Sequence, residues 1–159
     1  MKKIHKIFFA VVILLTVGLD QLVKYLSVVF LKPIDTFPII RNVFHLTYCE
    51  NTGAAFSMLS GARIFFIVIT AVFIVLLVWL MYSDRVQNVG AAYTKAIISA
   101  GGIGNLIDRI LNGYVVDMFD FRLINFAIFN VADIAVTCGA VAFLIIYIVK
   151  KGNVIKWKK

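Results

Sequence analysis

Four long apolar blocks constrain this chain more than any other feature of its sequence. They run over about residues 7–31, 64–82, 89–107 and 129–149. A bilayer core about 30 Å thick is crossed by a helix of roughly 20 apolar residues, so each block is long enough to span it. Four spans use most of the 159 residues and leave no room for a separate soluble domain. We therefore expect an all-α membrane protein, a single polytopic domain over residues 1–159 with four transmembrane helices.

The composition excludes the soluble classes of protein. Hydrophobic residues make up 62% of the chain and charged residues only 15%, which excludes a disordered chain, a disulfide scaffold and an ordinary water-soluble domain. The net charge of +8 could indicate nucleic-acid binding, but lysines cluster directly before the first block and after the last one. Basic clusters that flank apolar spans set membrane orientation and contact anionic lipid. We therefore expect membrane lipid as a partner and no nucleic acid.

The same basic residues predict the orientation of the chain. Besides the lysine-rich termini, Arg85 and Lys95 flank the short connection between the second and third blocks. Because basic residues concentrate on the cytoplasmic side, we expect both termini to be cytoplasmic. The outer segments are then about residues 32–63 and 110–128. The first of them alternates weakly and contains both prolines, which predicts a small extracytoplasmic β-sheet between spans one and two.

Ionisable and amide side chains occur within the spans, at their ends and in the outer segments. Inside a span such a side chain is costly unless it faces the interior of the bundle. The expected topology places all of these residues near the outer surface, although they are far apart in sequence. Their convergence at one depth predicts a functional site. They are Asp20 and Lys24 in the first span, Asn51 and Asp117 in the outer segments, Asn105, Asp108 and Arg109 at the end of the third span, and Asn130 and Asp133 at the start of the fourth.

Structural explanations remain open for several of these residues. Asp20 and Lys24 lie four residues apart on one helix face and can form an intrahelical ion pair. Arg109 can be an interfacial anchor or the ion-pair partner of Asp108. Asn130 can cap the fourth helix by accepting hydrogen bonds from first-turn amides.

The residue types limit the chemistry of such a site. The sequence contains no serine elbow, no paired histidines, no Walker loop and no cysteine–histidine pair, and its two cysteines lack metal-site spacing. We therefore expect no metal and no cofactor. Two carboxylates remain, and a pair of aspartates that shares one proton can activate water to hydrolyse an amide.

The alternative is a small membrane carrier that uses Asp20, Lys24 and Asp133 as an ion relay. Against it, the polar residues share one depth instead of crossing the membrane, and the block at 64–82 has no charge. A carrier also tends to contain internal repeats, which this sequence lacks. These observations favour the hydrolase.

Five short motifs occur in an order that resembles a known family. They are D-x-x-x-K from Asp20, N-x-G-x-A-F from Asn51, G-N-L-I-D-R from Gly104, G-x-V-V-D from Gly113 and F-N-x-A-D from Phe129. Together they resemble the motifs of the bacterial lipoprotein signal peptidases, the type II signal peptidases. The resemblance covers the whole chain.

This resemblance implies an aspartyl endopeptidase of the bacterial plasma (inner) membrane, with its active site at the outer face. Such an enzyme cleaves a prolipoprotein just before its diacylglyceryl-modified lipobox cysteine, uses no metal and is inhibited by globomycin-like compounds. We expect it to act as a monomer. The residues that the motifs imply are the catalytic pair Asp117 and Asp133, the substrate-binding residues Asn51, Gly53, Asn105, Arg109 and Asn130, and the supporting residues Asp20, Lys24 and Asp108.

Overall fold

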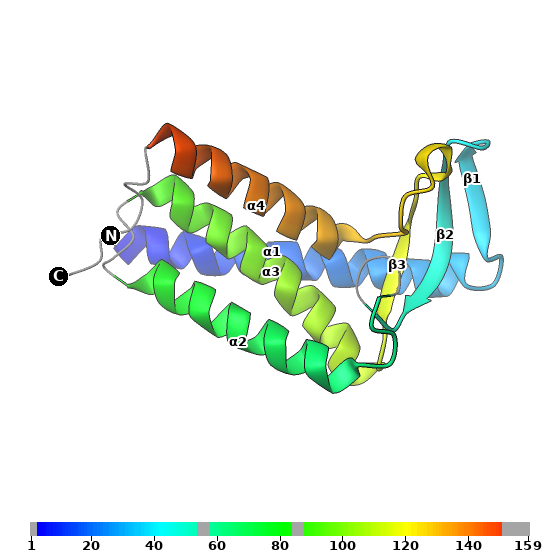
Figure 1. Cartoon of the computed structure of the whole chain (residues 1–159), viewed down its shortest axis with the longest axis horizontal. Coiled ribbons are helices and arrows are strands. Elements are labelled where there is room, and N and C mark those ends of the chain that lie inside the picture. The colour runs from blue at the N-terminus through cyan, green and yellow to red at the C-terminus, as the bar shows by residue number, and fades with distance from the viewer. Residues whose placement is uncertain (1–2, 54–57, 84–87, 151–159) are drawn as a thin grey trace.

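The computed structural model describes residues 3–53, 58–83 and 88–150, and within these ranges four long helices form a bundle with a small sheet at one end (Figure 1). The start of α1 and the end of α4 lie at the opposite end of the bundle. Motif residues 54–56, Arg85 and the lysines beyond Lys150 lie outside the described residues. The helices are α1 (Lys3–Leu26), which continues as a π-helical turn over Ser27–Leu31, α2 (Arg63–Tyr82), α3 (Val89–Leu111) and α4 (Val131–Val149).

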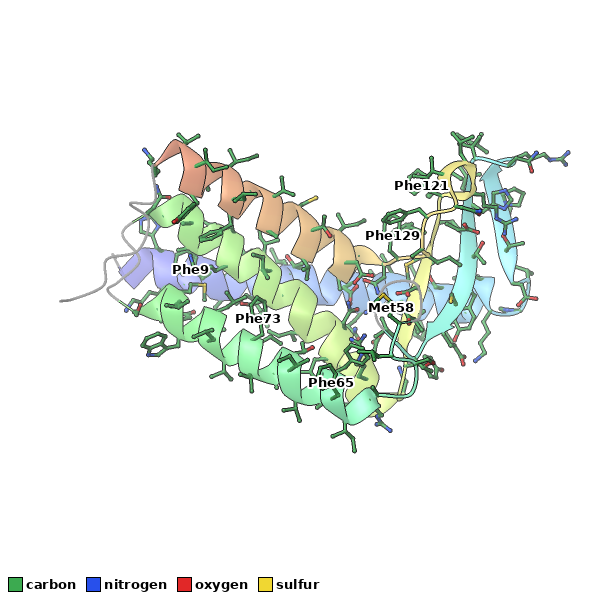
Figure 2. All side chains as sticks on the ribbon, viewed as in Figure 1. Phe9, Met58, Phe65, Phe73, Phe121 and Phe129 are labelled. Carbon is green, nitrogen blue, oxygen red and sulfur yellow. The ribbon has the colours of Figure 1, made fainter. Side chains whose placement is uncertain are left out.

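Three helical segments of the described chain are long and apolar enough to cross a membrane, whereas the sequence predicts four spans. They are His5–Leu31, Arg63–Tyr82 and Val131–Val149. Side chains project outward along these helices (Figure 2). Many of the exposed ones are large and apolar, for example Leu14 at 72% and Ile64 at 75% exposure. Surfaces of this kind face lipid in a membrane-integral protein.

Helix α3 packs against the other three helices and is less apolar than they are. Its small residues Ala92, Ala96 and Ala100 are fully buried, as expected for a face that another backbone approaches closely. The approach is tightest near the sheet, where a Cβ atom on Gly101 would collide with the backbone oxygen of Ala132 in α4. A Cβ atom on Gly104 would likewise collide with the Asp20 carboxylate of α1.

The sheet is antiparallel, with the strand order β1-β2-β3. Strands β1 (Thr36–Ile40) and β2 (Phe44–Asn51) come from the segment between α1 and α2, as the sequence predicts. Strand β3 (Val115–Asp120) comes instead from the segment between α3 and α4, so the prediction of a sheet built only between the first two spans was incomplete. Val116 and Met118 of β3 are buried against Leu31, and this packing fixes the strand over the end of α1.

Candidate active site

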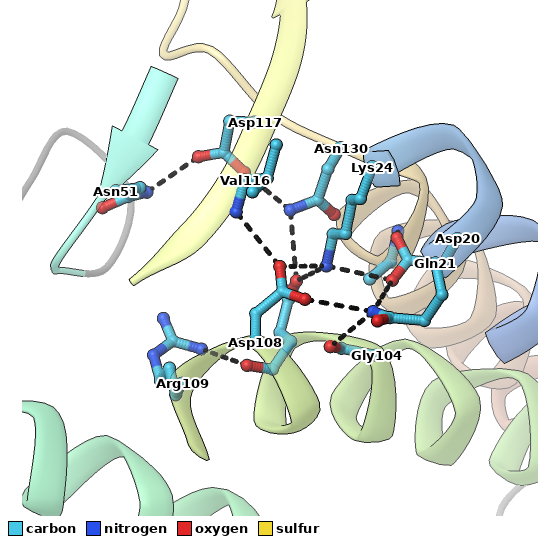
Figure 3. A network of polar contacts seen from close by, with 12 residues as sticks. Asp20, Gln21, Lys24, Asn51, Gly104, Asp108, Arg109, Val116, Asp117 and Asn130 are labelled. Atoms are coloured by element: carbon cyan, nitrogen blue, oxygen red, sulfur yellow. Dashed lines mark hydrogen bonds and ion pairs between the residues drawn. The ribbon is translucent and has the colours of Figure 1, made fainter. Parts of the chain in front are cut away.

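The polar residues that the sequence singles out gather where α1, α3, α4 and the sheet meet (Figure 3). Hydrogen bonds and ion pairs connect them into a network, so the structure brings together every predicted site residue. The members are Asp20 and Lys24 on α1, Asn51 and Gly53 at the end of β2 and just beyond it, Asn105, Asp108 and Arg109 on α3, Asp117 on β3, and Asn130 and Asp133 at the start of α4.

Asp117 lies in the middle of β3 and is only 1% exposed. Its two carboxylate oxygens accept hydrogen bonds from Asn130 Nδ2 at 2.6 Å and from Asn51 Nδ2 at 2.9 Å. Burial raises the pKa of Asp117 to about 7, the negative charge of Asp133 adds to the shift, and the two amide donors oppose it. A carboxyl group of this kind holds its proton close to neutral pH.

Asp133 lies in the first turn of α4, where it forms a capping box with Asn130. The Asn130 Oδ1 atom accepts from the Asp133 backbone N–H at 2.9 Å, and the Asn130 N–H donates to Asp133 Oδ2 at 3.2 Å. The other carboxylate oxygen accepts from Asn105 Nδ2 at 2.8 Å. The capping role expected for Asn130 is confirmed, and the same side chain also holds Asp117 through its Nδ2 group.

Behind the two aspartates lies a buried ionic cluster. Lys24 Nζ is 2.9 Å from Asp20 Oδ2 and 3.0 Å from Asp108 Oδ2, which confirms the intrahelical pair between Asp20 and Lys24. Asp20 also accepts a hydrogen bond from the Ala132 N–H of α4, and Asp108 accepts one from the Val116 N–H of β3. The cluster therefore ties α1 and α3 to the two elements that carry the aspartates.

The sequence allowed an ion pair between Arg109 and Asp108, but in the structure Arg109 contacts other groups. Its guanidinium donates to the Gly53 carbonyl at 2.9 Å and lies 4.9 Å from the centre of the Phe66 ring. Asp108 is instead paired with Lys24. Arg109 therefore joins the end of α3 to the segment after β2.

Sequence reasoning missed two residues that support the site. Gln21 Nε2 donates to Asp108 Oδ1 at 3.1 Å and to the Gly104 carbonyl at 3.2 Å. Its position beside Asp20 in an apolar block was the available signal. Arg63, at the start of α2, donates to the backbone oxygens of Arg109 and Ile110 at 2.7 and 2.8 Å. No sequence signal linked Arg63 to the end of α3, because the contact depends on how the helices pack.

A cavity of about 680 Å³ lies beside the two aspartates and is lined by both of them. Apolar side chains of α2, α3 and α4 form much of its wall. The volume and the few convergent polar groups are typical of a ligand site. Among the other lining residues are Asn105 and Arg109 near the aspartates, and Ile69, Phe73, Ile98 and Val136 along the helices.

Comparisons with known proteins agree with this arrangement. The family described as "Signal peptidase (SPase) II" matches residues 12–150. A lipoprotein signal peptidase of Caldanaerobacter subterraneus is 46% identical over 142 residues, which cover 89% of this chain and 97% of that protein. A lipoprotein signal peptidase of Halothermothrix orenii is 48% identical over 138 residues, 87% of this chain and 92% of that protein.

Two solved structures, both of bacterial membrane enzymes, have a similar fold. The first has a TM-score of 0.84 and 31% sequence identity, and covers 96% of this chain and 94% of the solved one. The second has a TM-score of 0.78 and 33% identity, and covers 87% and 91% of the two chains. The similarity extends over both the helices and the sheet.

Proposed function

The chain belongs to the signal peptidase II family, and we propose that Asp117 and Asp133 are its catalytic pair. The enzyme is an aspartic endopeptidase that removes the signal peptides of prolipoproteins, which is the activity of this family. One observation carries the assignment of the pair: both carboxylates line one cavity and each is held by N–H donors. The ion-relay carrier has no support from these relatives.

In the proposed mechanism, Asp133 is the general base and Asp117 is the general acid. Asp133 takes a proton from a water molecule while the water oxygen attacks the carbonyl carbon of the scissile amide. Asp117 gives its proton to the carbonyl oxygen, so a neutral tetrahedral intermediate forms. Asp133 then protonates the amide nitrogen, the C–N bond breaks, and Asp117 recovers a proton from a hydroxyl group of the intermediate. The raised pKa of Asp117 supports its role as the acid.

The remaining site residues divide by their contacts. Asn51, Asn105 and Asn130 donate to the aspartates, which supports a role in orienting the pair. Arg109 lines the cavity and contacts the Gly53 carbonyl, which supports a role for both in holding the substrate backbone extended. Positioning of this kind brings the scissile amide close to the attacking water.

The position of the pair at the sheet end of the bundle supports the membrane placement that we propose. In this proposal α3 is the fourth span, both termini are cytoplasmic, and the sheet lies at the outer face of the bacterial inner membrane. The scissile amide then reaches water at the headgroup level while the acyl chains of a diacylglyceryl cysteine stay in lipid. Cleavage occurs just before that cysteine. A globomycin-like inhibitor occupies the same cavity. The enzyme acts as a monomer, which is consistent with a site whose described residues all come from one chain.

The assignment is tested with a synthetic prolipoprotein that carries a diacylglyceryl cysteine, in detergent, with and without a chelator. We expect wild-type cleavage to survive chelation, and Asp117→Asn and Asp133→Asn each to abolish it. Asp120→Asn is the matched control, because Asp120 lies on the same strand but pairs with Arg122 and Thr47, away from the cavity. Cleavage by either variant of the pair at the wild-type rate would refute the assignment.

A further inference from the structure

Lys24 places a buried ammonium group behind the catalytic pair. Its side chain is only 4% exposed, and its Nζ atom lies within hydrogen-bond distance of three acceptors. They are Asp20 Oδ2 at 2.9 Å, Asp108 Oδ2 at 3.0 Å and Asn105 Oδ1 at 2.9 Å. An ammonium has three N–H donors, so these contacts use all of them.

The contact with Asn105 fixes which way that amide points. Because an ammonium only donates, the Asn105 atom that faces Lys24 has to be the carbonyl oxygen. The Nδ2 group therefore points away from Lys24, and it donates to Asp133 Oδ1 at 2.8 Å. If the amide turned over, its NH₂ group would face the ammonium and its oxygen would face a carboxylate, so both contacts would become repulsive.

The same carbonyl oxygen also reaches the other aspartate through one further amide. Asn105 Oδ1 accepts from Asn130 Nδ2 at 3.1 Å, and this Nδ2 group donates to Asp117 Oδ1 at 2.6 Å. We propose that Lys24 is a positioning residue for cleavage. Through Asn105 it keeps N–H donors directed at both aspartates, and its positive charge offsets part of the negative charge around them. This inference rests on the proposed catalytic pair.

The charge of Lys24 also affects a second measurable quantity besides the rate, the pKa of Asp117. The Lys24 ammonium lowers the pKa of Asp117, against the burial and the neighbouring Asp133 charge that raise it to about 7. Loss of the ammonium therefore raises the pKa of Asp117 further, and Asp117 keeps its proton to higher pH. Among the residues that the structure describes, the charged or titratable groups around the pair are Asp20 and Lys24 from α1, Asp108 and Arg109 from α3, and Cys49, which pairs with Asp117 in the sheet.

The experiment measures kcat/KM for the lipidated precursor as a function of pH. We expect Lys24→Met to lower the maximum of kcat/KM roughly tenfold or more, since it removes a hydrogen bond from a charged donor. We also expect the alkaline limb of the profile to move to higher pH. The control is Lys32→Met, the same substitution at a lysine whose side chain is 51% exposed and paired with Glu50. It should change neither the maximum nor the limb.

A second variant separates charge from orientation. Lys24→Met leaves Asp20 and Asp108 buried without their cation, whereas Lys24→Met/Asp108→Asn removes one negative charge together with the positive one. In the double variant we expect the alkaline limb to return to its wild-type position and the maximum to stay low. If Lys24→Met does not fold, we add Asn105→Ala both to the double variant and to the wild type. Asn105→Ala should cost less rate in the double variant than in the wild type, because Lys24 acts through Asn105. Equal losses in the two backgrounds would overturn the inference.

If Lys24→Met lowers kcat/KM equally at every pH and the alkaline limb of the profile does not move, Lys24 has only a structural role and the inference is overturned. A wild-type rate in either Lys24 variant would overturn it as well. Asp117→Asn is assayed in parallel, because cleavage by that variant would refute the catalytic pair itself. The two failures are therefore distinguishable.

Discussion

Among single residues, Asn130 links secondary structure to the site most directly. Its Oδ1 atom caps α4, while its Nδ2 group holds Asp117. The capping role could be predicted from the sequence, because an asparagine that precedes an apolar helix is a common N-cap. The bond to Asp117 could not, because it depends on where β3 passes over the helix end. The sequence therefore predicted most of the residues that gather here, but it could not predict which atom of each residue contacts which aspartate.

The raised pKa of Asp117 predicts how the stability of the protein depends on pH. Its folded-state pKa of about 7 lies above its ordinary value of 3.8, so the folded state binds more protons between these values. The contribution of Asp117 to the free energy of unfolding is therefore fully present below about pH 4. It falls as pH rises toward 7, by up to about 1.4 kcal/mol per pH unit. Asp117→Asn removes this pH-dependent contribution. The thermal midpoint of the variant should therefore rise relative to that of the wild type as the pH increases from 4 to 7.

Thermal unfolding at several pH values measures this difference, and Asp120→Asn is again the control, since the pKa of Asp120 lies below its usual range. A difference between Asp117→Asn and wild type that stays constant from pH 4 to 7 would mean that Asp117 is not buried as a protonated acid.

Among the secondary-structure elements, the helices and the third strand differ in how far the sequence could predict them. Apolar length identified each helix block, whereas the central position of α3 is known from its contacts with the other three helices. The sequence predicts only an outer segment where β3 lies, although Val115, Val116 and Phe119 are typical strand residues. Its pairing with β2 joins segments that are far apart in sequence, and no local pattern encodes such a pairing.

The close approach of α3 and α4 leads to a prediction at this scale. Gly101→Ala would force a Cβ atom against the Ala132 carbonyl and the Val136 side chain, so it should destabilise the protein by about 1–3 kcal/mol. It should also lower activity, because Ala132 precedes Asp133 in the first turn of α4.

Gly18→Ala is the matched control, since a Cβ atom at Gly18 of α1 meets nothing within 4 Å. Thermal midpoints and cleavage rates of the two variants, measured together, test the packing. Equal stability of the two would show that the helices are not in close contact at Gly101.

At the scale of the whole molecule, the bundle and the sheet create two environments side by side. The helices present apolar surfaces outward and an apolar cavity wall inward. The sheet covers one end of the bundle, and its strand β3 places Asp117 within hydrogen-bond distance of Asn130 at the start of α4. Hydrolysis of a membrane-anchored substrate needs both environments, because its lipid has to stay in hydrocarbon while its amide meets water. The outer surface of the bundle was predictable from composition, whereas the cavity depends on how three helices pack.

The most direct test of the proposed aspartate pair is the pH profile of kcat/KM for wild-type cleavage of the lipidated precursor, measured from pH 4 to 9 with a chelator present. This parameter reports the ionisations of the free enzyme. In the proposed mechanism Asp117 acts as the acid and has to keep its proton. Because burial raises its pKa to about 7, we predict a bell-shaped profile whose alkaline limb falls near neutral pH. A rate that keeps rising through pH 9, or that disappears on chelation, would contradict a metal-free aspartate pair.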